Sequence, residues 1–159
     1  MLEIINDYWV YFLIGQYPNG PLGGLVLTLL LASCGLVLAL PLGIVLGLAR
    51  VSPWRWLRWP VTGFVFVVRG LPLLMVIFWA YFFLPSVTGV KTDQFTTMLI
   101  ALVIFDAAYL AEIVRAGIQG LPRGQMETAR ALGLGYGRAM RLVVLPQALR
   151  SMLPSLVNQ

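Results

Sequence analysis

The hydrophobic residues of this chain form long blocks separated by short polar connections. Residues 22–49 contain no charged residue, and two further blocks carry only isolated charges. A hydrocarbon core about 30 Å thick is crossed by about 20 helical residues. The pattern therefore predicts an all-α fold, a polytopic transmembrane helical bundle. Its spans are expected at residues 22–49, 59–84 and 97–118, with a partial fourth at residues 142–159.

Two of the predicted spans contain residues that shape a helix. Gly35, Gly43 and Gly47 are four or eight residues apart, so they share one face and allow a neighbouring helix to approach closely. In the second span, the four residues from Arg69 to Pro72 place a charge and a proline inside the hydrophobic block. Because proline removes a backbone donor, we expect a kinked or locally opened helix there.

The distribution of arginines predicts the orientation in the membrane. The connection after the first span carries Arg50, Arg55 and Arg58 and no acidic residue, and residues 119–141 are also rich in arginine. Connections with excess positive charge stay in the cytoplasm. Residues 1–21 hold no lysine or arginine but several aromatic residues, and we expect them to form an external, interfacial segment with the N-terminus outside.

The composition excludes most other classes of protein. With 60% hydrophobic and 11% charged residues, the chain has too little polar surface for a water-soluble globule. The formal net charge of +5 comes from short arginine clusters, which suit lipid phosphate better than nucleic acid. There is no histidine and one cysteine, Cys34, so we expect no metal site, no cofactor and no enzymatic centre. No phosphate-binding G-x-x-x-x-G-K-[ST] loop is present, so ATP would bind a separate chain.

A short amphipathic unit lies within residues 119–141. After Pro122, residues 125–132 predict two turns of helix, with Glu127 near the positive helix start. Gly133 follows at the position where a left-handed C-terminal cap requires a residue without Cβ. A helix this short is unstable without support. Two interpretations fit the spacing equally: the helix docks onto a cytoplasmic partner, or it packs as an elbow on the membrane surface.

The same loop contains a spaced motif, which reads Glu127-Thr128-Ala129, three residues, Gly133, nine residues and Val143-Val144-Leu145-Pro146. This motif resembles the EAA loop of the permeases of binding-protein-dependent ABC importers, which reads E-A-A, three residues, G, nine residues, I-x-L-P. Residues 68–74, Val-Arg-Gly-Leu-Pro-Leu-Leu, are similar to the F-R-G-T-P-L-L segment of the polar amino-acid permeases. Residues 108–119 are also typical of that subfamily, and the resemblance extends over residues 23–159.

The resemblance implies the fold of a type I ABC importer. Residues 22–159 would form its transmembrane domain, and residues 119–141 would be the coupling loop. In this family, a permease pairs with a second permease subunit, in a homodimer or a heterodimer. The pair binds cytoplasmic ABC ATPase subunits and receives substrate from a periplasmic binding protein.

The resemblance also implies roles for residues in the loop. Glu127, Ala129 and Gly133 would form the contact with the ATPase, and Leu145 and Pro146 would return the chain to the membrane. Polar L-amino acids are the implied substrates, with glutamate and aspartate favoured. Family members continue through a complete fourth core helix and a fifth, so the resemblance implies a chain that is cut short at its C-terminus.

Four charged residues lie inside the three complete predicted spans. Arg69 and Asp106 are each about nine or ten residues from an end of their span, so both are expected near the middle of the bilayer. Because a lone charge there is costly, an ion pair between Arg69 and Asp106 is the favoured interpretation, and contact with a transported amino acid is the alternative. Glu112 and Arg115 are three residues apart, which predicts an intrahelical ion pair.

Two other functions are compatible with the residues alone. A fragment of a secondary transporter or channel would also carry charges at mid-membrane and kinked helices. A non-functional remnant of a permease would share every motif. The spacing within residues 119–141 has an explanation in an importer and none in a secondary transporter or channel, so the sequence favours the importer.

Overall fold

The computed structural model describes residues 2–89 and 93–158, and every named element within them is helical. In chain order these elements are α1 Leu2–Ile14, α2 Gly24–Val51, α3 Arg55–Gly70, α4 Leu73–Thr88, α5 Gln94–Gln119, α6 Gly124–Ala131, α7 Tyr136–Ala139, the π-helical turn η1 Met140–Val144 and α8 Leu145–Val157. The predicted all-α fold is confirmed.

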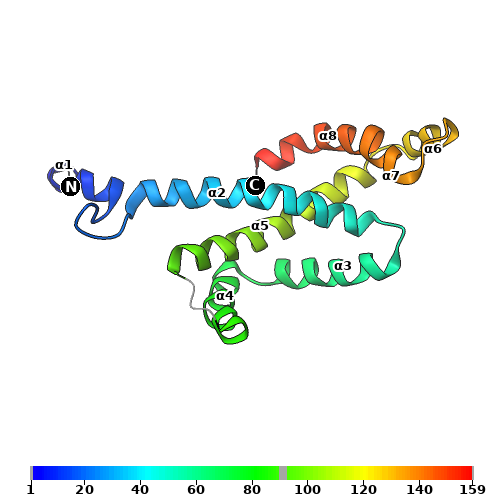
Figure 1. Cartoon of the computed structure of the whole chain (residues 1–159). Coiled ribbons are helices and arrows are strands. Elements are labelled where there is room, and N and C mark those ends of the chain that lie inside the picture. Colours follow the sequence, from blue (N-terminus) through cyan, green and yellow to red (C-terminus); the bar gives the residue numbers. More distant parts are fainter. Residues whose placement is uncertain (1, 90–92, 159) are drawn as a thin grey trace.

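Within the described ranges, α2 and α5 are the two single helices that are long and apolar enough to cross a membrane. They contain 28 and 26 residues, which corresponds to about 42 and 39 Å at 1.5 Å per residue. The bounds of α2 differ from the predicted residues 22–49 by two residues at each end, and α5 begins three residues before the predicted residues 97–118. The two helices lie along each other in Figure 1.

The predicted second span, residues 59–84, is two helices in the structure. α3 ends at Gly70, α4 begins at Leu73, and the pair is bent by 112°, so that α4 is seen nearly end-on in Figure 1. Pro72 has no N–H, and its ring disfavours the helical conformation at the preceding residue. Leu71 is accordingly extended, with φ −101° and ψ 143°. The sequence correctly predicted where the second span is irregular, but the predicted kink is a complete break between two helices.

A stripe of small residues on α2 faces α5. Gly35, Ala39, Gly43 and Gly47 are spaced four residues apart, and all four are buried. A methyl group on Gly43 would lie 2.5 Å from Cβ of Leu110, and one on Gly47 would lie 2.6 Å from its nearest side-chain neighbour on α5. The two backbones therefore approach more closely than any larger residue would allow. The packing role expected for these glycines is confirmed.

α5 is the central helix of the bundle, and it contacts α2, α3, α4 and α8 (Figure 1). Its fully buried small residues point in several directions and are Ala101, Ala107, Ala108 and Ala111. Ala107 packs with α2, Ala108 packs against Val65 of α3, and Ala101 packs against Val76 of α4. Because alanine occupies little volume, helices can approach α5 on several sides at once.

After α6, the chain runs back along α5 as a nearly continuous helix made of α7, η1 and α8. The apolar cluster that joins it to α5 consists of Val114, Ile118, Met140, Val144, Ala148 and Met152. Helix begins at Tyr136, six residues before the partial span predicted at residues 142–159. The π-helical turn lies directly before Pro146 of α8, where a proline ring would clash with an ordinary α-helical turn.

α1 lies at the end of α2 that is remote from α6 (Figure 1). The connection between α1 and α2 reverses the chain at Gly15 and Gly24, whose φ angles are +68° and +60°. Glycine adopts such angles without the steric penalty of a Cβ. An isolated antiparallel bridge between Gly15 and Leu22 completes the reversal.

The close approach of α2 and α5 predicts the effect of adding a side chain to the stripe. Gly47→Val should lower the free energy of unfolding by about 1–3 kcal/mol, because the new atoms overlap with α5. The matched control is Gly63→Val on α3, where a Cβ would meet nothing within 4 Å. Thermal unfolding in detergent compares the two variants. Equal midpoints would contradict the packing described here.

Candidate functional site

The loop between α5 and α8 carries a short helix with a well-defined end. α6 spans Gly124–Ala131, one residue earlier at each end than the predicted residues 125–132. At its C-terminus, the Leu134 N–H donates to the Ala129 carbonyl at 3.2 Å, and the Gly133 N–H donates to the Arg130 carbonyl at 3.0 Å. These two bonds form a Schellman motif. Gly133 has φ +84°, the left-handed conformation that the sequence analysis expected of it.

The predicted coupling residues differ in their exposure. Glu127 and Gly133 lie on the surface, whereas Ala129 is only 3% exposed and packs inward. Ala129 therefore supports α6 from below, and its own methyl group is not available to a partner. Leu132 is 79% exposed at the end of the helix. The sequence analysis did not single out this leucine, although an apolar residue directly before a capping glycine in a polar loop was a readable signal.

The loop is held against the rest of the chain by polar contacts. The Gln147 side-chain amide of α8 donates to Oε1 of Gln125 on α6 at 3.0 Å. The Tyr136 hydroxyl donates to the carbonyl of Val51 at 3.2 Å, which ties α7 to the end of α2. Burial raises the pKa of Tyr136 above its ordinary value, so this hydroxyl keeps its proton near neutral pH.

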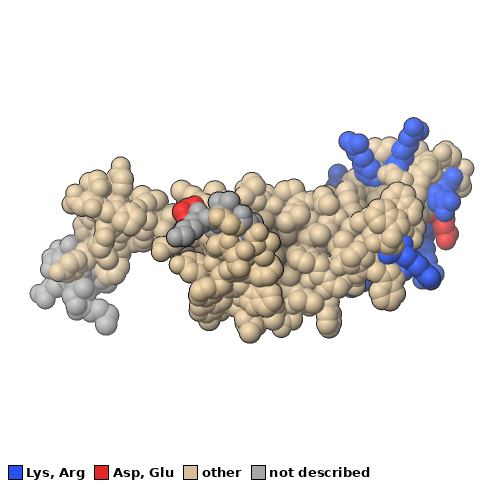
Figure 2. All heavy atoms as spheres, turned by 60° about the horizontal axis from the view of Figure 1, so that its bottom comes forward, with Lys and Arg blue, Asp and Glu red and all other residues tan. Residues whose placement is uncertain are grey.

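Positive charge gathers at the end of the molecule where α6 lies. Figure 2 shows the arginine side chains of the described residues gathered toward one end of the molecule. At the opposite end, Asp93 caps α5 by accepting a hydrogen bond from the Thr96 N–H at 3.2 Å. The hydrogen bonds from Thr96 hold the pKa of Asp93 below its ordinary value. The asymmetry of arginine expected from the sequence is thus present in the folded chain.

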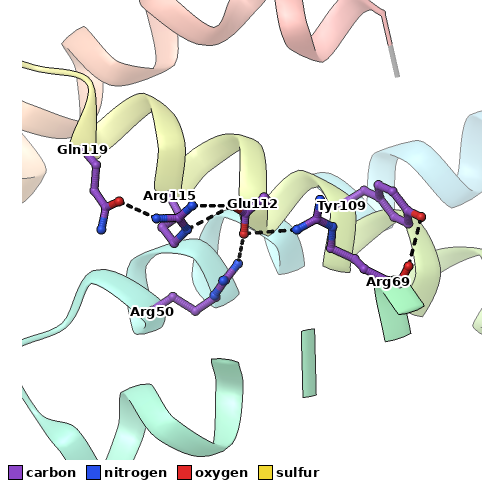
Figure 3. Close-up of polar contacts among 6 residues, drawn as sticks. All are labelled: Arg50, Arg69, Tyr109, Glu112, Arg115 and Gln119. Atoms are coloured by element: carbon purple, nitrogen blue, oxygen red, sulfur yellow. Dashed lines mark hydrogen bonds and ion pairs between the residues drawn. The ribbon is translucent and has the colours of Figure 1, made fainter. Parts of the chain in front are cut away.

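Glu112 of α5 is the centre of a charge cluster (Figure 3). Its Oε2 atom contacts Nη1 of Arg50 on α2 and Nη1 of Arg69 on α3, the latter at 3.3 Å. Its Oε1 atom accepts two hydrogen bonds from Arg115, the one from Nε at 3.2 Å. Nη1 of Arg115 in turn donates a hydrogen bond to Oε1 of Gln119. One carboxylate therefore joins three helices, and the intrahelical pair predicted for Glu112 and Arg115 is confirmed.

The predicted ion pair between Arg69 and Asp106 is replaced by the pair between Arg69 and Glu112 in the described structure. The Arg69 guanidinium lies 5.2 Å from the centre of the Tyr109 ring, and the Tyr109 hydroxyl donates to the Arg69 carbonyl at 3.4 Å. Asp106 and Glu112 are six residues apart, which places them about 120° apart around α5. Tyr109 and Glu112 share the face toward Arg69, and depth in the membrane alone could not reveal this.

Asp106 instead lines a cavity of about 560 Å³ between α2, α4 and α5. The wall is otherwise uncharged, and it includes Thr28, Gly35, Leu73 and Leu102. The two charges predicted near mid-membrane therefore occupy different environments. Arg69 belongs to a cluster with a carboxylate, and Asp106 faces an apolar hollow.

Apolar helices long enough to span a membrane, charges within them and a capped helix at the arginine-rich end define a polytopic helical membrane protein. The chain belongs to the family of binding-protein-dependent transport system inner membrane components, whose model matches residues 39–159. The resemblance to this family that residues 119–146 show is confirmed, and so is the placement of the chain in a membrane.

Two relatives illustrate the family. The chain is 41% identical over 153 residues to the inner membrane amino-acid ABC transporter permease protein YhdY of Escherichia coli strain K12, covering 95% of this chain and 42% of that protein. It is 39% identical over 145 residues to the glutamate/aspartate import permease protein GltK of Escherichia coli O6:H1, covering 87% of this chain and 65% of that protein. The chain thus spans less than two thirds of the length of either relative.

A solved structure shares the fold. The crystal structure of an amino acid ABC transporter with histidines matches with a TM-score of 0.80 and 33% identity, over 99% of this chain and 68% of that chain. The type I importer fold implied by the sequence motifs is confirmed by this match.

The Glu112 cluster predicts a specific loss of stability. Glu112→Gln should lower the free energy of unfolding by about 1–3 kcal/mol, because three guanidinium groups lose the one carboxylate that neutralises them. The matched control, Glu127→Gln on the exposed face of α6, should change it by less than about 0.5 kcal/mol. Chemical unfolding in detergent measures both. A Glu112 variant as stable as the control would show that the cluster contributes nothing.

Proposed function

We propose that this chain is a permease subunit of an ATP-driven importer that moves polar L-amino acids across the inner membrane. Its family membership and its amino-acid permease relatives support this proposal. The observation that carries it is α6, a capped helix that stands at the arginine-rich end with an exposed leucine at its tip (Figure 2). A secondary transporter or channel would need no such helix.

ATP hydrolysis takes place on separate ABC ATPase chains that dock against α6. Glu127 offers a charge, Leu132 offers an apolar anchor, and Gly133 provides the turn that ends the helix. Ala129 keeps α6 seated on the chain. Movement of α6 is passed on where the chain re-enters the membrane helix at Leu145 and Pro146, as α8 begins there.

The remaining partners follow from the importer proposal. A second permease subunit completes the pore, and a substrate-binding protein delivers the amino acid from outside. The arginine-rich end faces the cytoplasm, and α1 lies at the opposite end of α2 (Figure 1). This arrangement supports an external position for residues 1–21 and an external N-terminus.

Glutamate and aspartate are the substrates to be tested first. GltK is named for their import, but the chain spans only part of such relatives. We place Arg69 and Asp106 along the substrate pathway. Arg69 adjoins the break between α3 and α4, and Asp106 lines the neighbouring cavity. Unwound backbone and intramembrane charge mark substrate sites in many transporters.

The coupling role of α6 is tested at its glycine cap. In vesicles that hold the assembled transporter, Gly133→Asp should abolish ATP-driven uptake of L-glutamate, because a side chain at φ +84° distorts the cap and adds charge at the docking surface. Insertion into the membrane should be unaffected. Gly137→Asp on α7, where a Cβ meets nothing within 4 Å, is the matched control. Undiminished uptake by the Gly133 variant would contradict the coupling role.

The exposed leucine gives a second test. Leu132→Ser should weaken co-purification of the ATPase about tenfold, since removing a buried anchor from an interface costs about 1–2 kcal/mol. Leu142→Ser is the control, because Leu142 is also exposed, at 63%, but lies outside α6. Titration of the purified ATPase onto each variant in detergent measures the two affinities. Equal affinities would remove Leu132 from the interface.

A further inference from the structure

Asp106 is a carboxylate within the apolar helix α5. It lies twelve residues after the first residue of α5 and thirteen before the last, and therefore near the middle of the span. Within the described residues, no hydrogen bond or ion pair joins its side chain to another group. An isolated carboxylate in an apolar environment is costly. Such a group is expected to have a cationic partner outside the described residues.

The cavity beside Asp106 has the size and lining of a site for a small molecule. Its volume is about 560 Å³, within the range of about 300–1,000 Å³ that is common for ligand pockets. The Thr28 hydroxyl on its wall already donates to the carbonyl of Gly24. Asp106 is thus the one charged side chain on a wall that is otherwise apolar or satisfied, and it would determine how a polar ligand is oriented.

The break between α3 and α4 gives the cavity a second polar feature. Leu73, the first residue of α4, lies on its wall. No side chain caps this end of α4, and the start of a helix carries partial positive charge on its first N–H groups. A molecule held by its cationic group at Asp106 would therefore meet a partly positive wall at α4, which suits a neighbouring carboxylate.

We propose that this cavity binds the transported amino acid, with its α-ammonium group at the Asp106 carboxylate. This inference rests on the proposed import of amino acids and names the residue that recognises the group all of them share. Arg69 is already paired with Glu112, so its guanidinium group is not the cationic partner of Asp106. In this proposal, the cation that pairs with Asp106 is the ammonium group of the substrate. The test must distinguish this from pairing with a basic side chain of the second permease subunit.

The test compares L-glutamate with glutarate, which has the same two carboxylates and lacks the ammonium group. In vesicles that hold the assembled transporter, Asp106→Asn should raise KM for L-glutamate uptake about 10- to 100-fold, as expected for a lost charge-assisted hydrogen bond. The inhibition constant of glutarate should stay within about twofold. The preference for the ammonium group would thus disappear, and Asp106→Glu should restore part of it.

Asp93→Asn is the matched control, since it makes the same change on the same helix outside the cavity. Asparagine caps helices about as well as aspartate, so KM and the preference should be unchanged. A fall in kcat with KM and preference intact for Asp106→Asn would overturn the proposal, because the loss of a contact that binds the substrate raises KM. Normal behaviour of that variant would overturn it too.

A direct measurement decides the matter if Asp106→Asn fails to assemble. L-Glutamate, but not glutarate, should raise the unfolding midpoint of the wild-type complex, and equal effects of the two would overturn the proposal. If the transporter favours glutamine, the same comparison is made between L-glutamine and glutaramate, which lacks the ammonium group. Wild-type complex that takes up neither amino acid with ATP would count against the proposed function. Uptake with unaltered preference in the variant would count against this site alone.

Discussion

The contact between α2 and α5 is the constraint on which the other features depend. Glycine and alanine at four-residue intervals from Gly35 to Gly47 let the backbone of α2 approach α5 until a methyl group on Gly43 or Gly47 would overlap with α5. α5 can then serve as the axis against which α3, α4 and α8 pack. In a lipid environment, where apolar burial drives little association, this steric fit is a main source of helix affinity.

The central helix α5 also carries two acidic residues, Glu112 and Asp106, at different positions along its length. Toward the arginine-rich end, Glu112 gathers guanidinium groups from α2, α3 and α5 itself, which ties the three helices by a polar contact that apolar lipid cannot replace. Half-way along, Asp106 is left facing a hollow. Glu112 is thus engaged in ion pairs that hold the helices together, whereas Asp106 is the carboxylate that we propose binds the substrate.

Much of this arrangement could be read from the sequence, and the remainder could not for definite reasons. Pro72 fixed the place of the helix break, but its 112° angle depends on how Val76 of α4 packs against α5. Depth along the span suggested Asp106 as the partner of Arg69. The angular position of Glu112 and the reach of an arginine side chain decided otherwise. Exposure of Leu132 and burial of Ala129 emerge only once α6 is seated on the chain.

The π-helical turn at Met140–Val144 gives the chain a point of torsional compliance. There the Leu145 N–H reaches back to the carbonyl of Met140, five residues earlier, because Pro146 cannot complete an ordinary turn. A rotation of α7 about the helix axis can be absorbed by redistributing the bonds of this turn, while α8 keeps its register against α5. In the importer that we propose, a displacement of α6 would reach α8 through this turn without unwinding the membrane helix.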